Sequence, residues 1–332
     1  MHEVIAAPKP ESGFESEERV DILLSTFNGE RYFLEQIRSV LDQSHQNIRV
    51  IIRDDGSTDD TVALVRQQQK KDSRIQFIEN TAGNLGPARS FMELLRHSTA
   101  PYIMFCDQDD VWRARKVQIS IAALSGRSRS EPCLVQSDLE VVSENLNLIS
   151  KSYISRHNLP NRNVFADLLV QNNVTGCTVL FNASLRLIAQ QYTPSYMVMH
   201  DGWLALIASL YGTVVMIDEP LIQYRQHSSN AVGSKKGLWK FLERVRSPKK
   251  LLAIYAASEK QARELNKLKA EVHDFIPHQR ESSELVDYLS YCDGGIMKRI
   301  SFFFHSKYRK KSVLSNFIYR SLFVLLTFFG RK

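Results

Sequence analysis

The sequence predicts an α/β protein built on a mostly parallel sheet, and three observations lead to this fold class. Short β-branched runs alternate with stretches of helical periodicity between residues 20 and 106. Their spacing is that of β-α-β units, which place strands side by side in parallel. Polar clusters at Ser25, Asp54 and Asp107 each follow an apolar run. Ligands of such sheets bind beyond the carboxyl ends of the strands, so the clusters predict a binding site there.

The expected elements of the first half begin with Val20–Leu24, a buried strand that leads into the loop Ser25–Gly29. Apolar residues at helical spacing then cover Tyr32–Leu41, and Ile48–Ile52 is a second strand. The other elements expected here are a helix through Val62–Val65, strand Ile75–Glu79, helix Pro87–Arg96 and strand Tyr102–Cys106.

The second half continues the same domain with a mixture of strands and helices. The expected strands are Leu134–Ser137, Thr178–Phe181 and Val214–Ile217, and the expected helices are Leu185–Gln190 and Asp201–Leu210. We divide the chain into a disordered lead-in (residues 1–18), one domain (19–233, with a nucleotide-binding half 19–125 and an acceptor half 126–233), and a basic helical region (234–332).

Composition excludes several classes of protein. The chain has 332 residues, 43% of them hydrophobic, which is enough for a sizeable core. The four cysteines form no CxxC pair, which argues against a zinc knuckle or a disulfide framework. Neither GxGxxG nor GxxxxGK[ST] is present, which argues against dehydrogenases and P-loop enzymes. A nucleotidyltransferase would carry a glycine-rich loop with a lysine near the N-terminus, and this is also missing.

The net charge of +7 suits an anionic partner. The basic residues gather towards the C-terminus beside apolar runs, which favours a membrane surface over nucleic acid. Residues 301–332 mix aromatic residues with lysine and arginine, as in a helix that lies in the bilayer interface. A core or oligomer-contact helix is the alternative. Because residues 1–18 lack the pattern of a secretory signal, we expect a cytoplasmic protein, peripheral on the cytoplasmic face of the inner membrane.

The sharpest chemical signal is Phe105–Asp110, in which Asp107, Asp109 and Asp110 place three carboxylates within four positions. Such carboxylates repel one another unless a cation lies between them. A divalent ion such as Mg²⁺ or Mn²⁺ binds carboxylates together with substrate phosphates, and it can neutralise a leaving diphosphate. The alternative is an acidic turn that caps a helix starting near Trp112.

Two further clusters are candidates for binding a nucleotide. A carboxylate in Asp54–Ser57 can accept hydrogen bonds from a pyrimidine or a ribose, although Asp-Gly-Ser is also a common turn. Arg89 lies near a helix start, where it can face diphosphate oxygens or simply be a solvated surface residue.

Asp201 is the candidate general base. It opens an expected helix, and a carboxylate within reach of an acceptor hydroxyl can take its proton. His200 and Trp203 would shape the pocket around it. Alternatively, Asp201 is only a helix N-cap.

The segment Tyr224–His227 follows an expected strand. His227 can complete the metal site, or hold the diphosphate together with Arg225; a structural histidine is the alternative.

Taken together, these motifs resemble those of the family 2 glycosyltransferases over about residues 20–233. The motifs that carry the resemblance are Ser25–Gly29, Asp54–Asp59, Asn84–Gly86, Asp107–Asp110 with Trp112, and Tyr224–His227. The resemblance implies a GT-A fold, a nucleotide-diphosphate sugar donor, a divalent metal and inversion at the anomeric carbon. It also implies that Asp55 recognises the base, that Ser25 contacts the nucleotide and that Asp201 is the catalytic base.

The resulting assignment covers the whole expected site. Nucleotide binding is assigned to Ser25, Thr26, Asn28, Asp54, Asp55, Arg89 and Asp107; the DXD metal site to Asp109, Asp110 and His227; and the acceptor pocket to Trp112, His200, Trp203 and Arg225. We favour Asp109 or Asp110 as the metal ligand. His200 stands where many relatives carry glutamate. This departure concerns the assignment of the neighbouring Asp201 as the base.

Within the family, Asp-Gln-Asp-Asp-Val-Trp, His-Asp-Gly-Trp and Tyr-Arg-Gln-His look like the bacterial rhamnosyltransferases. That resemblance implies dTDP-L-rhamnose as donor and a lipid-linked surface polysaccharide, such as an O-antigen, as acceptor. The alternatives are a UDP-sugar donor (glucose, galactose or N-acetylhexosamine) and an inactive sugar- or lipid-binding scaffold on the same fold.

Overall fold

A computed structural model describes residues 2–8, 18–159, 165–227, 248–310 and 313–325. At its centre is a ten-stranded sheet. Eight strands form its path, in the order β1 (His2–Ile5), β10 (Thr213–Gln226), β7 (Cys133–Ser143), β9 (Val179–Asn182), β5 (Tyr102–Cys106), β2 (Val20–Thr26), β3 (Ile48–Asp54) and β4 (Ile75–Ile78). Two short strands pair at its side, β6 (Val111–Trp112) with β10 and β8 (Leu148–Ser150) with β7.

The sheet is mostly parallel, as predicted. The pairs of β2 with β3 and β5, of β3 with β4, and of β10 with β1 and β7 are all parallel. β9 is the exception on this path, because it runs antiparallel to both of its neighbours, β5 and β7. The carboxyl ends of β2, β3 and β5 therefore lie next to one another, where the polar clusters begin.

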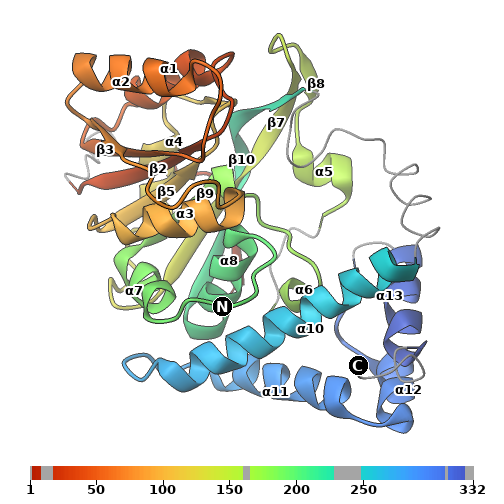
Figure 1. Cartoon of the computed structure of the whole chain (residues 1–332). Helices are drawn as coiled ribbons and strands as arrows, with labels where there is room; N and C mark the ends of the chain where they lie inside the picture. The colour runs from red at the N-terminus through yellow and green to blue at the C-terminus, as the bar shows by residue number, and fades with distance from the viewer. Residues whose placement is uncertain (1, 9–17, 160–164, 228–247, 311–312, 326–332) are drawn as a thin grey trace.

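Helices cover both faces of the sheet, because the side chains of its central strands alternate between two apolar layers. Ile22 and Leu24 of β2 belong to one layer, whereas Leu23 belongs to the other. Figure 1 shows α1 and α2 above the sheet and α3, α7 and α8 below it. The helices of this half are α1 (Phe33–Leu41), α2 (Thr61–Lys71), α3 (Pro87–Arg96), α4 (Lys116–Ala122), α5 (Tyr153–His157), α6 (Phe165–Val170), the 3-10 helix η1 (Gly176–Thr178), α7 (Ala183–Gln191) and α8 (His200–Tyr211).

The N-terminal segment differs from the expected disordered lead-in at residues 1–18. His2–Ile5 forms the edge strand β1 and pairs in parallel with Val214–Ile217. The segment gives backbone partners to the edge of β10, and Ile5 packs against the core on one face. Residues 9–17 lie outside the described part of the chain.

The C-terminal region consists of α10 (Pro248–Glu271), α11 (Gln279–Asp293), α12 (Ile296–His305) and α13 (Val313–Leu325). Of these helices, cyan to blue in Figure 1, α10 and α11 lie beside α6, and α11 also contacts α8. α12 and α13 pack against each other, α12 against α11 and α13 against α10. Leu265, Leu268 and Leu285 belong to the same hydrophobic cluster as α8, so the sheet domain and the C-terminal helices share one core. Among the described helices, none combines the length and the apolar character needed to cross a membrane.

Candidate active site

A cleft of about 850 Å³ opens at the carboxyl ends of β2, β3 and β5. Its walls include six predicted residues of the first half and three of the second: Ser25, Thr26, Asn28, Asp55, Asp107, Asp109, His200, Asp201 and His227. The same wall includes residues 171–176, which sequence reasoning did not single out. The fold therefore gathers residues that are up to two hundred positions apart.

Asp54 shapes the first nucleotide loop from within and does not line the cleft, contrary to its assigned role in nucleotide binding. Its buried carboxylate accepts hydrogen bonds from the Thr26 hydroxyl (2.8 Å) and from the amides of Gly56 (3.0 Å) and Ser57 (2.7 Å). With both oxygens engaged, Asp54 closes the turn after β3. Gly56 completes that turn with φ +94°, a conformation that favours glycine.

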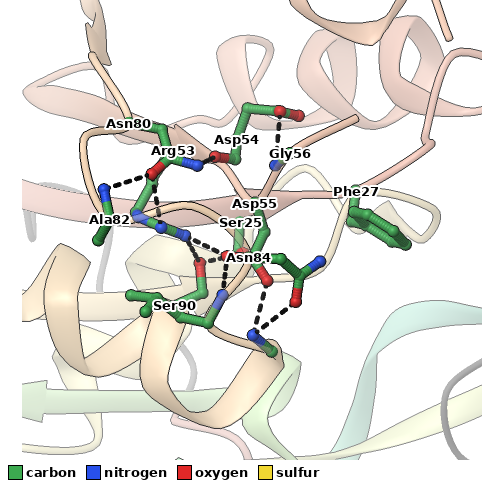
Figure 2. Close-up of polar contacts among 12 residues, drawn as sticks. Ser25, Phe27, Arg53, Asp54, Asp55, Gly56, Asn80, Ala82, Asn84 and Ser90 are labelled. Atoms are coloured by element: carbon green, nitrogen blue, oxygen red, sulfur yellow. Dashed lines mark hydrogen bonds and ion pairs between the residues drawn. The ribbon is translucent and has the colours of Figure 1, made fainter. Parts of the chain in front are cut away.

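Asp55 joins two segments of the cleft wall, and Figure 2 shows the network around it. Its carboxylate accepts hydrogen bonds from the amides of Leu85 and Gly86, each at 2.8 Å. It also pairs with the buried guanidinium of Arg53 at 2.5 Å. Arg53 in turn reaches Asn80 Oδ1 at 3.0 Å. The loop after β4 is thereby held against the end of β3.

Arg53 is a functional residue that sequence reasoning missed. The sequence does carry a signal for it: Arg53 stands between the apolar run Ile48–Ile52 and two aspartates. An arginine at the end of a buried strand needs a carboxylate partner, which here is Asp55. Arg53 also donates to the Ser90 hydroxyl at 2.8 Å, which links β3 to α3.

Arg89 does not line the main cleft. Its side chain is exposed and borders a second groove, which meets the cleft at Gly86, Pro87 and Met199. The predicted contact of Arg89 with the donor diphosphate is therefore not supported by this arrangement.

The acidic loop after β5 divides between the cleft and the interior. Asp107 and Asp109 line the cleft, whereas Asp110 is buried and faces inward. One Asp110 oxygen accepts a hydrogen bond from the amide of Arg225 at 3.1 Å. Ligand atoms of Asp107, Asp110 and Cys177 lie within 4.8 Å of one another. Asp110 thus belongs to a group of possible metal ligands behind the cleft surface, and its assignment as a metal ligand stays a prediction.

The electrostatics of this loop favour a bound cation. Burial raises the pKa of Asp107 to about 7, and the charges of Asp109 and Asp201 add to the effect. Asp109 Oδ2 lies 2.8 Å from Nε2 of His227, whose ring packs on Tyr32. Carboxylate oxygens with one imidazole form a donor set suited to Mn²⁺ and compatible with Mg²⁺. The residues present therefore fit a divalent metal.

Trp112 supports the acidic loop from below and does not line the acceptor pocket to which it was assigned. It forms the short strand β6, so the alternative of an acidic turn that caps a helix starting near Trp112 does not apply, and it is almost fully buried. The ammonium of Lys116 lies 3.4 Å from the centre of its indole ring. Burial lowers the pKa of Lys116 to about 7. A buried cation thus lies under a loop that carries three carboxylates.

Arg225 and Trp203 are likewise structural and do not line the pocket. Arg225 is buried in β10, where its Nε donates to the Asp109 carbonyl at 2.8 Å and its guanidinium pairs with Glu35. It also lies over the Tyr32 ring at 4.7 Å. Trp203 is fully buried in the core on the inner side of α8. Both assignments to the acceptor pocket are therefore corrected.

Asp201 has the environment expected of a general base. It lies in the first turn of α8, beside the cleft and nearly buried. Burial raises its pKa to about 6, although hydrogen bonds to its carboxylate oppose the shift. One of these comes from Asn172 Nδ2, 2.8 Å from Oδ1. Asn172 precedes η1 by several residues and was not foreseen, because its partner is remote in sequence.

His200 forms part of the floor of the cleft as a neutral imidazole. Burial lowers its pKa to about 3. Its ring lies 4.2 Å from that of Phe91 and 4.7 Å from that of Phe105, measured between centroids. A side chain at Gly176 would place a Cβ 2.7 Å from His200 Nε2, so only glycine allows η1 to approach the start of α8 this closely.

Comparison with known proteins agrees with this geometry. Residues 21–186, half of the chain, match the family described as glycosyl transferase family 2. The chain belongs to this family. The dTDP-rhamnosyl transferase RfbG of Shigella flexneri is 28% identical over 241 residues, which are 68% of this chain and 79% of RfbG. The putative teichuronic acid biosynthesis glycosyltransferase TuaG of Bacillus subtilis is 28% identical over 67% of this chain and 83% of TuaG.

An uncharacterized glycosyltransferase of Nostoc sp. is 25% identical, and the match spans 66% of its length. Among solved structures, S. aureus TarS in complex with UDP-GlcNAc aligns with a TM-score of 0.55 at 16% identity, over 87% of this chain and 76% of that one. The mannosyltransferase PcManGT of Pyrobaculum calidifontis, in complex with GDP-Man and Mn²⁺, aligns with a TM-score of 0.51 at 16% identity, over 98% and 90%. These structures confirm the predicted GT-A fold. The chain is a family 2 glycosyltransferase with a set of C-terminal helices.

Proposed function

We propose that this glycosyltransferase is an inverting, metal-dependent enzyme that moves L-rhamnose from dTDP-L-rhamnose to a glycan acceptor. The observation that carries the proposal is the placement of Asp201, a carboxylate with a raised pKa, in the same cleft as Asp107 and Asp109. The similarity to the rhamnosyl transferase RfbG supports the choice of donor sugar. A UDP-sugar donor is the alternative that the experiment below separates.

In the proposed mechanism, one set of residues binds the donor and its leaving diphosphate, and Asp201 activates the acceptor hydroxyl. Asp109 and His227, with Asp107 beside them, would hold Mg²⁺ or Mn²⁺, which neutralises the diphosphate as it leaves. Asp55 and Ser25 face the nucleotide part of the donor. Asp201 takes the proton of the acceptor hydroxyl, and the oxygen attacks the anomeric carbon from the face opposite the diphosphate. The bond from that carbon to the diphosphate oxygen breaks, so the configuration inverts.

The test is a donor panel. Purified protein with Mn²⁺ or Mg²⁺ would be given dTDP-L-rhamnose, UDP-sugars and GDP-mannose, and release of the nucleoside diphosphate would be measured. Turnover with dTDP-L-rhamnose that disappears with EDTA and in Asp201→Asn is the expected result. Turnover with a UDP-sugar instead would overturn the choice of donor, and no binding of any nucleotide by calorimetry would favour an inactive scaffold.

We further propose that the acceptor is lipid-linked and that α12 and α13 hold the enzyme at the cytoplasmic face of the inner membrane. Large apolar side chains stand exposed on these two helices, among them Met297 (75%), Phe304 (66%) and Phe317 (57%). Lys298 and Lys307 lie beside them in sequence. Exposed apolar residues next to lysines are typical of helices that lie in an anionic bilayer surface. The last residues of the predicted membrane segment, 326–332, lie outside the described part.

Vesicle flotation tests this arrangement. Phe304→Ser with Phe317→Ser should release the protein from vesicles that contain anionic lipid, because both rings would lose their apolar environment in the interface. Leu148→Ser, a change of a similarly exposed residue (52%) on β8, is the control and should leave flotation unchanged. Equal flotation of the double variant and the wild type would contradict the proposal.

A further inference from the structure

The segment 192–199, which we call the base loop, connects α7 to α8 and leads directly into Asp201. Its residues from Thr193 to Met199 form one wall of the second groove, of about 760 Å³, that joins the catalytic cleft. The opposite wall comes from α3 and the loop before it. The conformation of the base loop therefore sets both the shape of this groove and the approach to the proposed base.

The base loop is held by side chains of α10. Among the hydrogen bonds of the described residues, no amide of residues 193–198 donates to a backbone carbonyl. Instead, the Ser195 amide donates to Glu264 at 2.6 Å, and the Val198 amide donates to Gln261 at 3.2 Å. Glu264 and Gln261 lie about one turn apart on the same helix, and both are buried.

The carboxylate of Glu264 is the centre of this attachment. Besides the Ser195 amide, it accepts the Ser195 hydroxyl at 2.9 Å, the Tyr192 hydroxyl at 2.8 Å and the ammonium of Lys267 at 2.8 Å. Burial opposes its ionisation, but the hydrogen bonds from Lys267, Tyr192 and Ser195 outweigh burial and lower its pKa to about 2. Glu264 is thus a permanent anion whose two oxygens are both satisfied.

A buried carboxylate is costly unless its hydrogen bonds are complete, and three of these four donors belong to the base loop. α10 also packs on α11 and α13. There, Ser258 of α10 hydrogen-bonds at 3.1 Å to Tyr288 of α11 and lies 3.1 Å from Tyr319 of α13. α10 therefore connects the C-terminal helices to the segment that carries Asp201.

We propose that Glu264 is a positioning residue for sugar transfer: it orders the base loop and, through it, the second groove, where the acceptor would bind, and the direction of Asp201. This inference rests on the proposed role of Asp201 as base, and it is independent of which sugar is transferred. The C-terminal helices are then part of the catalytic architecture as well as the proposed membrane contact.

Kinetics of Glu264→Gln and Glu264→Ala test the proposal, with Glu259→Gln as the matched control. Glu259 lies on the same helix, and its ion-pair partner among the described residues is Arg263 of α10, at 2.6 Å. Loss of the Glu264 carboxylate should lower kcat/KM for the acceptor by about 10- to 100-fold, because a small displacement of a catalytic group greatly slows the reaction. The KM for the donor should stay near the wild-type value, since the nucleotide loops do not touch Glu264. The control should match the wild type.

Hydrogen exchange provides the second readout and does not require turnover. In Glu264→Ala, the amides of Ser195 and Val198 should exchange faster than in the wild type and in Glu259→Gln, while β2 and β3 keep their protection. If exchange in the base loop is unchanged, or if acceptor and donor kinetics fall equally, the proposal is wrong. If the wild type transfers no sugar at all, the proposed function fails, and the exchange experiment still decides whether Glu264 orders the loop.

Discussion

The pH dependence of transfer should follow the ionisation of Asp201. Burial raises the pKa of this carboxylate to about 6, and only its ionised form can accept a proton from the acceptor. The turnover number should therefore rise with pH and level off above about pH 7. At pH 5, where about one tenth of the base is ionised, the rate should be about a tenth of the plateau.

Removing one hydrogen bond to Asp201 should shift the acid side of this pH profile by an amount that can be calculated. In Asn172→Ala the carboxylate loses the amide donor at 2.8 Å, which stabilises the ionised form. A hydrogen bond to a charged group contributes about 1.5–3 kcal/mol, and one pKa unit corresponds to about 1.4 kcal/mol. With the lower figure, the midpoint should shift upward by about one unit, to about pH 7.

The assay measures nucleoside diphosphate release from pH 5 to 9 at saturating donor, acceptor and metal, with each variant normalised to its own plateau. Asn173→Ala is the matched control, because Asn173 borders the same cleft and its side-chain oxygen accepts a hydrogen bond from Gln171. Asp201→Asn should lower the plateau by about 10²- to 10⁴-fold. If the acid limb of Asn172→Ala coincides with that of the wild type, or if Asp201→Asn stays active, the assignment of the base is refuted.

Three further predictions concern the parts of the chain around the base. Asp109→Asn should weaken Mn²⁺ binding, measured by calorimetry, by more than about tenfold, because the Asp109 carboxylate lines the cleft beside His227. Since burial lowers the pKa of Lys116 to about 7, the unfolded chain binds more protons above that pH. Urea denaturation should show the wild type gaining about 2 kcal/mol of stability relative to Lys116→Met from pH 7 to pH 9. Arg53→Met should cost about 3–5 kcal/mol of unfolding free energy, because it leaves Asp55 buried without its cation; a cost below about 1 kcal/mol would contradict the buried ion pair.

Local periodicity was sufficient for most of the sheet and for the location of the site. The helix Pro87–Arg96 and the strand Tyr102–Cys106 have the predicted bounds, because a proline at its first position favours the helix and a short, continuously apolar run favours a buried strand. Parallel strands end at one edge, so the clusters after β2, β3 and β5 had to meet. β1 was missed because a four-residue strand has too little pattern of its own and depends on the free edge of β10.

The sequence by itself thus determined the fold class, the family and the edge of the sheet where the chemistry takes place, since these depend on local patterns and motifs. Only the tertiary structure decided which way each side chain points. Asp109 faces the cleft while Asp110 turns towards the interior, although the two are adjacent in the chain. Asn172 and Glu264 act through partners 29 and 69 positions away, and no local pattern encodes such pairs. The physical reason is that orientation and burial are set by the packing of remote elements, which appears only once the chain has folded.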